Sequence, residues 1–421
     1  MKLLIPTIYL KKGQAVTCLQ KQQEVLSTDP VSLAAKYRDE DADALMIFDL
    51  SCGDEEHEIN LDVMKAICEI AEVPVYGAGN VKRMEDIKKI LYTGCKKAVL
   101  NYSKAEGIAI TEEVSKKFGA DKLLASVSEL SQLRDNRELL EQYVSGVICM
   151  NEIQTKEIKL PLYAHVSSQP ENKSYDMISG DVVDGLMGNA VLDIESLRTF
   201  KEKLDQAGKE TTFVKSAFAW SDFKLNSDGM VPVVVQDYKT DAVLMVAYMN
   251  EEAYQKTLQT GKMTYYSRSR QELWLKGDTS GHFQYVKSLT ADCDMDTILA
   301  RVSQVGAACH TGRYSCFYQN IMEKEYEEKN PMKILQSVYD VIEDRKLHPK
   351  EGSYTNYLFD KGIDKILKKV GEEATEIVIA AKNPNKNEVK YEISDFLYHM
   401  MVLMAEKGVS WEEITDDLAK R

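Results

Sequence analysis

The stretch that decides the middle of the fold reads Asp292-Cys293-Asp294-Met295-Asp296, and Cys309-His310-Thr311-Gly312-Arg313-Tyr314-Ser315-Cys316 follows it. In an extended strand, alternate side chains share one face. This spacing therefore predicts an acidic row with Cys293 on the opposite face. Carboxylates suit Mg²⁺ and thiolates suit Zn²⁺, so two different metal sites are expected, and three thiolates leave a fourth zinc position open for catalysis. The alternative is a solvated strand edge beside buried cysteines.

The composition narrows the class of protein. A chain of 421 residues has room for two to four domains. A net charge of −14 argues against a general nucleic-acid binder. No apolar run approaches the ~20 residues of a membrane span, and the N-terminus does not resemble a signal peptide. Most of the eight cysteines lie in apolar surroundings, which favours a cytoplasmic protein with metal-binding thiols rather than disulfides.

Residues 1–210 alternate apolar β-type runs with amphipathic helical stretches. The eight predicted strands are residues 3–9, 44–50, 73–76, 98–102, 122–127, 146–150, 161–166 and 182–187. Eight strands with intervening helices predict a (β/α)8 barrel-like domain. An open doubly wound sheet is the alternative.

Two segments of this region carry a resemblance. Residues 5–13 (IPTIYLKKG) and 77–82 (GAGNVK) resemble the first strand and a phosphate loop of two histidine-biosynthesis barrels, the phosphoribosyl-formimino isomerase and cyclase. Those barrels carry an aspartate where this chain has Tyr9, and a second one at the end of strand five, where residues 122–127 lack a carboxylate. Residues 165–169 also lack the glycine of a second phosphate loop. We therefore expect a non-catalytic barrel, with Gly77 and Gly79 forming a tight turn rather than a phosphate site.

Residues 211–320 are β-rich and predict a central α+β metal domain with one helix over residues 250–261. Five blocks in order, VAYMN (246–250), YYSRSR (265–270), LWLKGDTSGH (273–282), DCDMD (292–296) and CHTGRYSC (309–316), resemble phosphoribosyl-AMP cyclohydrolase. The resemblance implies hydrolytic opening of an adenine ring between N1 and C6.

It also implies roles for individual residues. The zinc ligands would be Cys293, Cys309 and Cys316, with Cys293 coming from the other subunit of a homodimer, and the Mg²⁺ ligands would be Asp292, Asp294 and Asp296. His282 and His310 are candidates for proton transfer to the departing ring nitrogen, and Arg268, Arg270, Lys276 and Arg313 for binding substrate phosphates. The alternatives are structural histidines and solvated surface cations.

After a charged linker at residues 322–331, residues 331–421 predict an all-α domain. Glu372, Glu373 and Glu376 lie on one helix, and Glu392 and Asp395 lie on the next. Residues three or four apart share a helix face, so two antiparallel helices can bring these carboxylates together as a Mg²⁺ site. A solvated acidic face is the alternative.

The segments KVGEEATE (369–376) and YEISDFLYH (391–399) resemble the phosphoribosyl-ATP pyrophosphatase branch of the all-α nucleotide pyrophosphohydrolases. This resemblance implies removal of pyrophosphate, with Glu373 and Glu376 as catalytic carboxylates and Lys369 on phosphate. The sequence thus indicates a bifunctional histidine-biosynthesis hydrolase acting on phosphoribosyl nucleotides. The alternatives are a house-cleaning nucleotide hydrolase and a non-catalytic regulatory protein.

Overall fold

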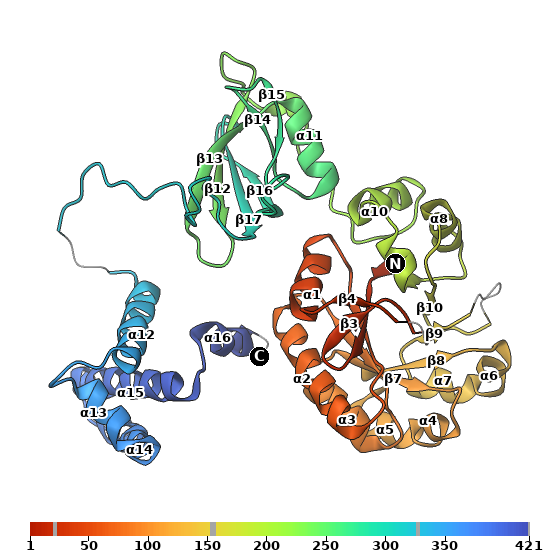
Figure 1. Ribbon diagram of the computed structural model, residues 1–421, viewed down its shortest axis with the longest axis horizontal. Coiled ribbons are helices and arrows are strands. Elements are labelled where there is room, and N and C mark those ends of the chain that lie inside the picture. The colour runs from red at the N-terminus through yellow and green to blue at the C-terminus, as the bar shows by residue number, and fades with distance from the viewer. Residues whose placement is uncertain (20–22, 152–156, 326–328, 420–421) are drawn as a thin grey trace. The chain divides into compact units, whose positions relative to one another are not determined.

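The computed structural model describes residues 1–19, 23–151, 157–325 and 329–419. The chain divides into two compact units, residues 1–319 and 320–421. Figure 1 shows the three parts of the fold: a barrel, a smaller sheet-rich region and a group of helices. The predicted multidomain layout is therefore confirmed.

The first part is a closed parallel barrel. Its strands are β1 (Leu3–Ile5), β2 (Thr7–Lys11), β5 (Leu45–Asp49), β6 (Val75–Ala78), β7 (Lys97–Asn101), β8 (Leu123–Val127), β9 (Val147–Cys149), β10 (Leu162–His165) and β11 (Gly185–Met187). The strands β1 and β2 are two halves of one run interrupted at Pro6. Because β1 pairs with β11 while β2 pairs with β5, the sheet closes on itself. A hairpin of β3 (Gln14–Val16) and β4 (Val25–Ser27) extends from β2.

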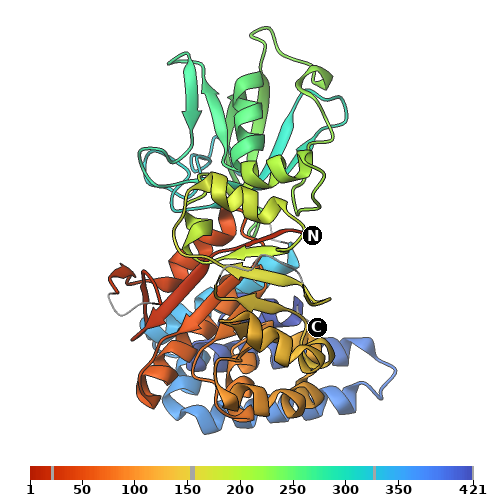
Figure 2. The same ribbon diagram turned by 90° about the vertical axis from the view of Figure 1, so that its right-hand side faces the viewer.

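Helices surround most of the barrel wall (Figure 2). They are α1 (Pro30–Asp39), α2 (Asp54–Ile70), α3 (Met84–Tyr92), α4 (Ala105–Ala109), α5 (Thr111–Phe118), α6 (Leu130–Asp135), α7 (Arg137–Tyr143), α8 (Glu171–Ser179), α9 (Asn189–Leu192) and α10 (Leu197–Gln206). Alternation along each strand separates two apolar layers. On β5, for example, Leu45 and Ile47 pack against the helices, whereas Met46 and Phe48 fill the barrel interior.

Aromatic side chains occupy the barrel mouth, where the strands end. The Tyr9 hydroxyl lies 2.9 Å from Nε2 of His165, and the Tyr9 ring stacks on Phe48 with centroids 5.9 Å apart. Phe48 also meets the His165 ring edge-on at 5.6 Å. The position where the resembling barrels carry an aspartate is thus part of a packed aromatic cluster.

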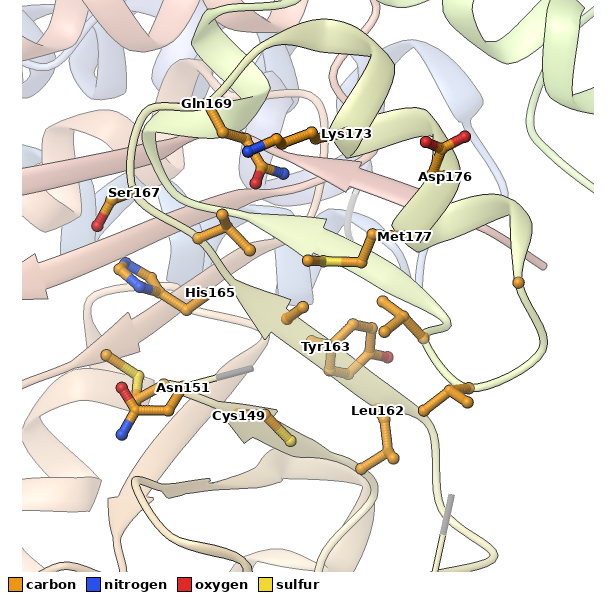
Figure 3. Close-up of a pocket in the computed structure, with 16 residues that line it drawn as sticks. Cys149, Asn151, Leu162, Tyr163, His165, Ser167, Gln169, Lys173, Asp176 and Met177 are labelled. Atoms are coloured by element: carbon orange, nitrogen blue, oxygen red, sulfur yellow. The ribbon is translucent and has the colours of Figure 1, made fainter. Parts of the chain in front are cut away.

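A cavity of about 840 Å³ lies on the outer wall of the barrel between β9, β10 and α8 (Figure 3). Cys149 and Leu162 of the strands line one side, and Lys173 and Asp176 of α8 line the other. The described residues between β9 and β10, 150–151 and 157–161, form no helix. Burial raises the pKa of the Cys149 thiol to about 12, so this thiol is an unreactive wall of the cavity. None of the predicted site residues lines it.

The sheet-rich region continues the same compact unit. Its elements are β12 (Val231–Asp237), β13 (Val243–Met249), α11 (Glu251–Thr260), β14 (Thr264–Ser267), β15 (Glu272–Leu275), β16 (Gln284–Ala291) and β17 (Ile298–Gln304). The main sheet has the order β13-β12-β17-β16, and β14 and β15 form a separate hairpin. Asn250 caps α11 by accepting from the Ala253 N–H at 2.9 Å, and Gly261 ends it at φ +69°. The helix predicted for residues 250–261 is confirmed.

Charged and polar groups join this region to the barrel. Asp39 at the end of α1 accepts two hydrogen bonds from Arg38, at 2.9 and 2.8 Å. Lys287 of β16 lies 3.5 Å from Asp39 and 3.1 Å from Glu72, and the Tyr238 hydroxyl donates to Glu72. The barrel helices are therefore bonded directly to the strands of the smaller sheet.

The second unit is helical. It contains α12 (Pro331–Leu347), α13 (Tyr354–Lys361), α14 (Ile363–Ala380), α15 (Lys386–Lys407) and α16 (Trp411–Ala419). Ile342, Leu358, Ile366 and Val402 belong to its buried core. The helix α13 was not predicted from the sequence, whereas the other four were. Among the described residues, no helix of the chain is long and apolar enough to cross a bilayer.

The buried His165 in the aromatic cluster at the barrel mouth predicts that the stability of the fold depends on pH. Burial lowers the pKa of His165 to about 4, from an ordinary value of 6.5. Between these pH values the unfolded chain binds a proton that the folded chain excludes, so stability falls as the pH drops from about 6.5 towards 4. We expect the free energy of unfolding of His165→Gln to fall less over this pH range than that of the unaltered chain, by roughly 2–3 kcal/mol. Urea unfolding followed by circular dichroism at each pH measures this difference. The exposed His348 provides the control, because His348→Gln should leave the loss intact. An unchanged acid loss in His165→Gln would contradict the assignment.

Candidate metal centres and substrate sites

The three aspartates of residues 292–296 lie on a turn. The strand β16 ends at Ala291 and β17 begins at Ile298, so the predicted extended strand is wrong. Asp292 Oδ1 accepts from the backbone N–H groups of Asp296 at 3.0 Å and Thr297 at 3.2 Å, and Met295 takes φ +63°. These side-chain-to-backbone bonds replace strand pairing with a closed loop.

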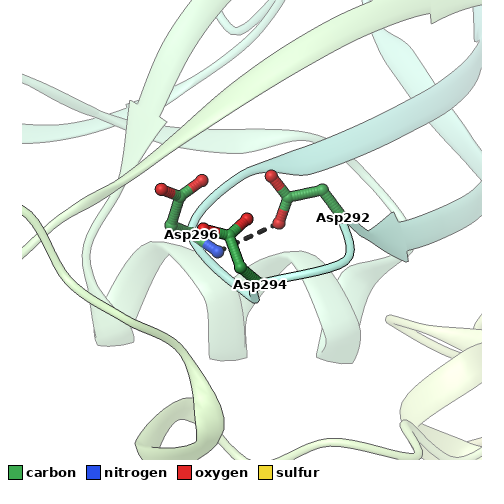
Figure 4. A group of neighbouring side chains, drawn as sticks. All are labelled: Asp292, Asp294 and Asp296. Carbon is green, nitrogen blue, oxygen red and sulfur yellow. Dashed lines mark hydrogen bonds between the residues drawn. The ribbon is translucent and has the colours of Figure 1, made fainter.

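The turn still gathers the carboxylates. Oxygens of Asp292, Asp294 and Asp296 lie within 4.8 Å of one another, and all three residues are exposed (Figure 4). Partial desolvation opposes ionisation of Asp292, but the N–H groups of Asp296 and Thr297 outweigh it and lower the pKa of Asp292. The turn therefore presents convergent hard oxygens of the kind that suits Mg²⁺.

Two of the three predicted zinc thiols share one site. Cys309 is buried, and its Sγ lies 3.1 Å from Thr311 Oγ1, which is the main reason that the pKa of Cys309 is lowered. Burial, followed by the interaction with Cys309, raises the pKa of Cys316. Cys293 is exposed on the acidic turn, and among the described residues of one chain the three cysteines do not form a ligand group.

Lys276 lies beside these thiols and contacts His282. Lys276 is buried, and its Nζ donates to the His282 carbonyl at 3.3 Å. Burial lowers the pKa of Lys276, although the neighbouring Cys316 and Cys309 raise it. Gly306 packs against the His282 ring, since a Cβ there would meet the ring Cδ2 at 2.6 Å. The structure thus places Lys276 against the thiols, while His310 is exposed next to Cys309.

The predicted phosphate-binding arginines are exposed and rest on aromatic rings. Arg268 lies 3.8 Å from the centroid of Tyr248, and Arg313 lies 4.1 Å from that of Tyr318. Arg270 pairs with Glu272 at 3.3 Å.

Arg268 also lines a pocket of about 530 Å³ whose walls include Tyr248, Tyr266, Ser267, Ser269 and Trp274. A planar base and a phosphate could both be bound in this pocket.

The helical unit gathers a second acidic group. Carboxylate oxygens of Glu373, Glu376 and Glu392 lie within 4.8 Å of one another, where α14 packs against α15. Glu373 is only 4% exposed, whereas Glu376 is exposed. A buried carboxylate beside two others is costly without a cation, so this arrangement fits a divalent metal better than a solvated face.

Two predicted ligands lie outside this group. Glu372 pairs with Lys369 at 3.0 Å and with Lys368 at 3.4 Å. These contacts lower the pKa of Glu372, and Lys369 makes the largest contribution. The Asp395 side chain is exposed, and its backbone carbonyl accepts from Nδ1 of His399 at 2.9 Å. Lys369 also lies 3.4 Å from Glu373, so it serves the acidic group as a counter-charge.

The barrel glycines are packed against protein atoms. A Cβ at Gly77 would meet Ile90 at 2.5 Å, and a Cβ at Gly79 would meet the Asp49 carbonyl oxygen at 2.2 Å. These glycines are required by close packing of the chain itself. The predicted tight turn holds only for Gly79, at φ +111°, because Gly77 is a paired residue of β6.

Sequence reasoning overlooked two residues near the helical group. His399 is buried and its Nδ1 lies 3.6 Å from Glu373 Oε1. Its Nε2 lies 3.0 Å from the Tyr354 hydroxyl. His399 stands four residues after Asp395 on the same helical face, and that spacing was the available signal. Tyr354 lies on the unpredicted α13, so no pattern pointed to it.

The fold and its two acidic groups define a multidomain protein in which a barrel precedes two regions with clustered metal-type ligands. Residues 245–318 match the family Phosphoribosyl-AMP cyclohydrolase, residues 335–421 match Phosphoribosyl-ATP pyrophosphohydrolase, and residues 3–159 match Histidine biosynthesis protein. These matches cover all three parts of the fold.

Individual proteins agree with the family matches. A histidine biosynthesis bifunctional protein of Thermoanaerobacter pseudethanolicus is 56% identical over 210 residues, which are 47% of this chain and 97% of that protein. The corresponding protein of Bacillus subtilis is 48% identical over 200 residues, covering 48% of this chain and 95% of that protein. The chain belongs to the family of histidine biosynthesis bifunctional proteins. It is a hydrolase with a cyclohydrolase region and a pyrophosphohydrolase region, preceded by a barrel.

The helical group predicts unequal roles for two neighbouring acids. Glu392→Gln removes one of three convergent carboxylates, so the Mg²⁺ concentration for half-maximal pyrophosphate release should rise about tenfold or more. Asp395→Asn alters a side chain outside the group and should change this concentration much less. Initial rates of pyrophosphate release measured over a Mg²⁺ titration give this concentration for each variant. A larger effect of Asp395→Asn would place the metal elsewhere on α15.

Proposed function

We propose that the two hydrolase regions act in sequence on one nucleotide. The helical domain, residues 331–421, converts phosphoribosyl-ATP to phosphoribosyl-AMP and diphosphate. The cyclohydrolase domain, residues 211–320, then opens the adenine ring of phosphoribosyl-AMP. The observation that carries this proposal is the presence of a separate acidic ligand group in each region, with Glu373, Glu376 and Glu392 in one and Asp292, Asp294 and Asp296 in the other.

In the helical domain, the three glutamates would hold Mg²⁺, which supplies charge neutralisation for the triphosphate and activation of water. The oxygen of a water molecule bonds to the α-phosphorus, and the bond from that phosphorus to the diphosphate leaving group breaks. Glu376 is the exposed carboxylate of the group and takes the proton released by this water. Lys369, placed between Glu372 and Glu373, balances negative charge as the diphosphate departs.

In the cyclohydrolase domain, Cys309 and Cys316 would hold Zn²⁺ together with Cys293 of the partner subunit. Zinc supplies the Lewis acidity that makes water a nucleophile near neutral pH. Water oxygen bonds to C6 of the purine, the N1–C6 bond breaks, and N1 receives a proton. His282, held against Gly306, and His310, next to Cys309, are the side chains that carry this proton.

A homodimer is part of this proposal. Its support is geometric, because Cys293 is exposed on the acidic turn and is not grouped with Cys309 and Cys316 among the described residues of one chain. A second copy can bring its Cys293 to the open side of that pair. The acidic turn, with Asp292, Asp294 and Asp296, would hold Mg²⁺ near the same interface.

The substrate of the cyclohydrolase domain binds in the pocket beside Arg268. Tyr248 and Tyr266 offer flat apolar surfaces for the purine, and Arg268 offers fixed charge and paired donors for a phosphate. Arg270, Arg313 and Lys276 add positive charge around the same domain. Phosphoribosyl nucleotides are therefore the proposed ligands of both domains.

The barrel, residues 1–210, is proposed to be a non-catalytic scaffold. Tyr9, Phe48 and His165 fill its mouth, and Gly77 and Gly79 are packed against protein atoms. Its helices are bonded to the cyclohydrolase domain through Asp39 and Glu72. None of the eight cysteines, all of which lie among the described residues, forms a disulfide, which supports action in the reducing cytoplasm.

Product analysis with two variants tests the reaction order. With phosphoribosyl-ATP, Mg²⁺ and Zn²⁺, the unaltered chain should yield diphosphate and the ring-opened product. Glu376→Gln should stop diphosphate release yet still open the ring of added phosphoribosyl-AMP. Cys309→Ser should release diphosphate and accumulate phosphoribosyl-AMP. Turnover of modified nucleoside triphosphates without turnover of phosphoribosyl-ATP would instead indicate a house-cleaning hydrolase.

A further inference from the structure

A polar chain in the helical unit runs from Tyr354 on α13 to His399 on α15 and ends at Glu373 on α14. Only Glu373 of these three residues has a role in the reaction described above. His399 is 5% exposed and Glu373 is 4% exposed, whereas the Tyr354 side chain is nearly half exposed. Three helices therefore meet at His399, which contacts the partly exposed Tyr354 on one side and Glu373 of the acidic group on the other.

The contacts fix the orientation of the imidazole. Nδ1 donates to the Asp395 carbonyl at 2.9 Å, which assigns the ring hydrogen to that nitrogen. Nε2 then accepts from the Tyr354 hydroxyl at 3.0 Å. The Tyr354 and Tyr398 rings both meet His399 edge-on, with centroids 5.9 and 5.5 Å away. Two hydrogen bonds and two ring contacts leave the imidazole no freedom to rotate.

The fixed ring bounds the space available to Glu373. Glu373 Oε1 lies 3.6 Å from Nδ1, which is too long for a hydrogen bond to a nitrogen already engaged with Asp395. The same Oε1 also lies 3.4 Å from Nζ of Lys369. His399 thus confines the Glu373 carboxylate by contact and leaves its oxygens available to a cation.

We propose that His399 is a positioning residue that holds Glu373 in the acidic group, and that Tyr354 anchors His399 from the surface of the unit. This inference rests on the proposed function of the helical domain. Displacing the imidazole lets the Glu373 carboxylate swing away from Glu376 and Glu392, so the unit should bind its divalent cation less tightly and turn over more slowly. Supporting groups of this kind typically affect metal affinity or activity by about 10–100-fold.

The test uses the full-length protein and measures diphosphate release from phosphoribosyl-ATP over a Mg²⁺ titration. His399→Ala should lower kcat about tenfold or more and raise the Mg²⁺ requirement, with a much smaller change in substrate KM. His399→Asn should recover most of both losses, because its amide can place an N–H near the Nδ1 position. Tyr354→Phe, which keeps the ring and loses the hydroxyl, should show a smaller loss of the same kind.

Two controls separate positioning from folding. The Tyr357 ring stacks beside that of Tyr354, with centroids 6.1 Å apart, and its hydroxyl forms no hydrogen bond with the described residues, so Tyr357→Phe should match the unaltered chain. Ring opening of added phosphoribosyl-AMP, carried by the other unit, should be unchanged in every variant. Unaltered Mg²⁺ dependence in His399→Ala, or a loss that His399→Asn does not recover, would overturn the proposal. Absence of diphosphate release by the unaltered chain would refute the proposed function instead.

Discussion

Convergence of like-charged ligands is the constraint on which the functional parts of this protein depend. Oxygens of Glu373, Glu376 and Glu392 lie within 4.8 Å of one another, and so do those of the three aspartates on the turn before β17. Such groups repel one another, and burial increases the cost, so a fold must hold them in place until a cation compensates the charge. Each acidic group is accordingly built on a rigid local structure.

The two groups are held by different means. In the helical unit, packing of α14 against α15 brings the carboxylates together, with Lys369 and His399 beside the buried Glu373. In the cyclohydrolase domain, a five-residue turn does so through backbone bonds to Asp292, at the surface rather than in a core. In the helical group only Glu373 is buried, whereas all three aspartates of the turn are exposed.

The sequence predicted the parts of the fold that follow from local patterns, and missed those that depend on tertiary packing. The eight barrel strands and the cap of α11 follow from periodicity and from Asn250 and Gly261, and the structure confirms them. The strand expected at residues 292–296 is a turn, because the Asp292 side chain bonds its own backbone, which alternation of residue types cannot reveal. The Tyr354–His399–Glu373 contacts join three helices, so no short sequence motif contains them.

We propose that the protein combines a soft-metal thiolate site for ring opening with an independent hard-metal carboxylate site for diphosphate release. Selective metal removal tests it most directly. A zinc-selective chelator, applied in excess Mg²⁺ while both products from phosphoribosyl-ATP are followed, should abolish ring opening, leave the rate of diphosphate release unchanged and cause phosphoribosyl-AMP to accumulate. Restoring Zn²⁺ should restore ring opening. A parallel fall of both activities on chelation, or ring opening that survives complete loss of zinc, would contradict the account.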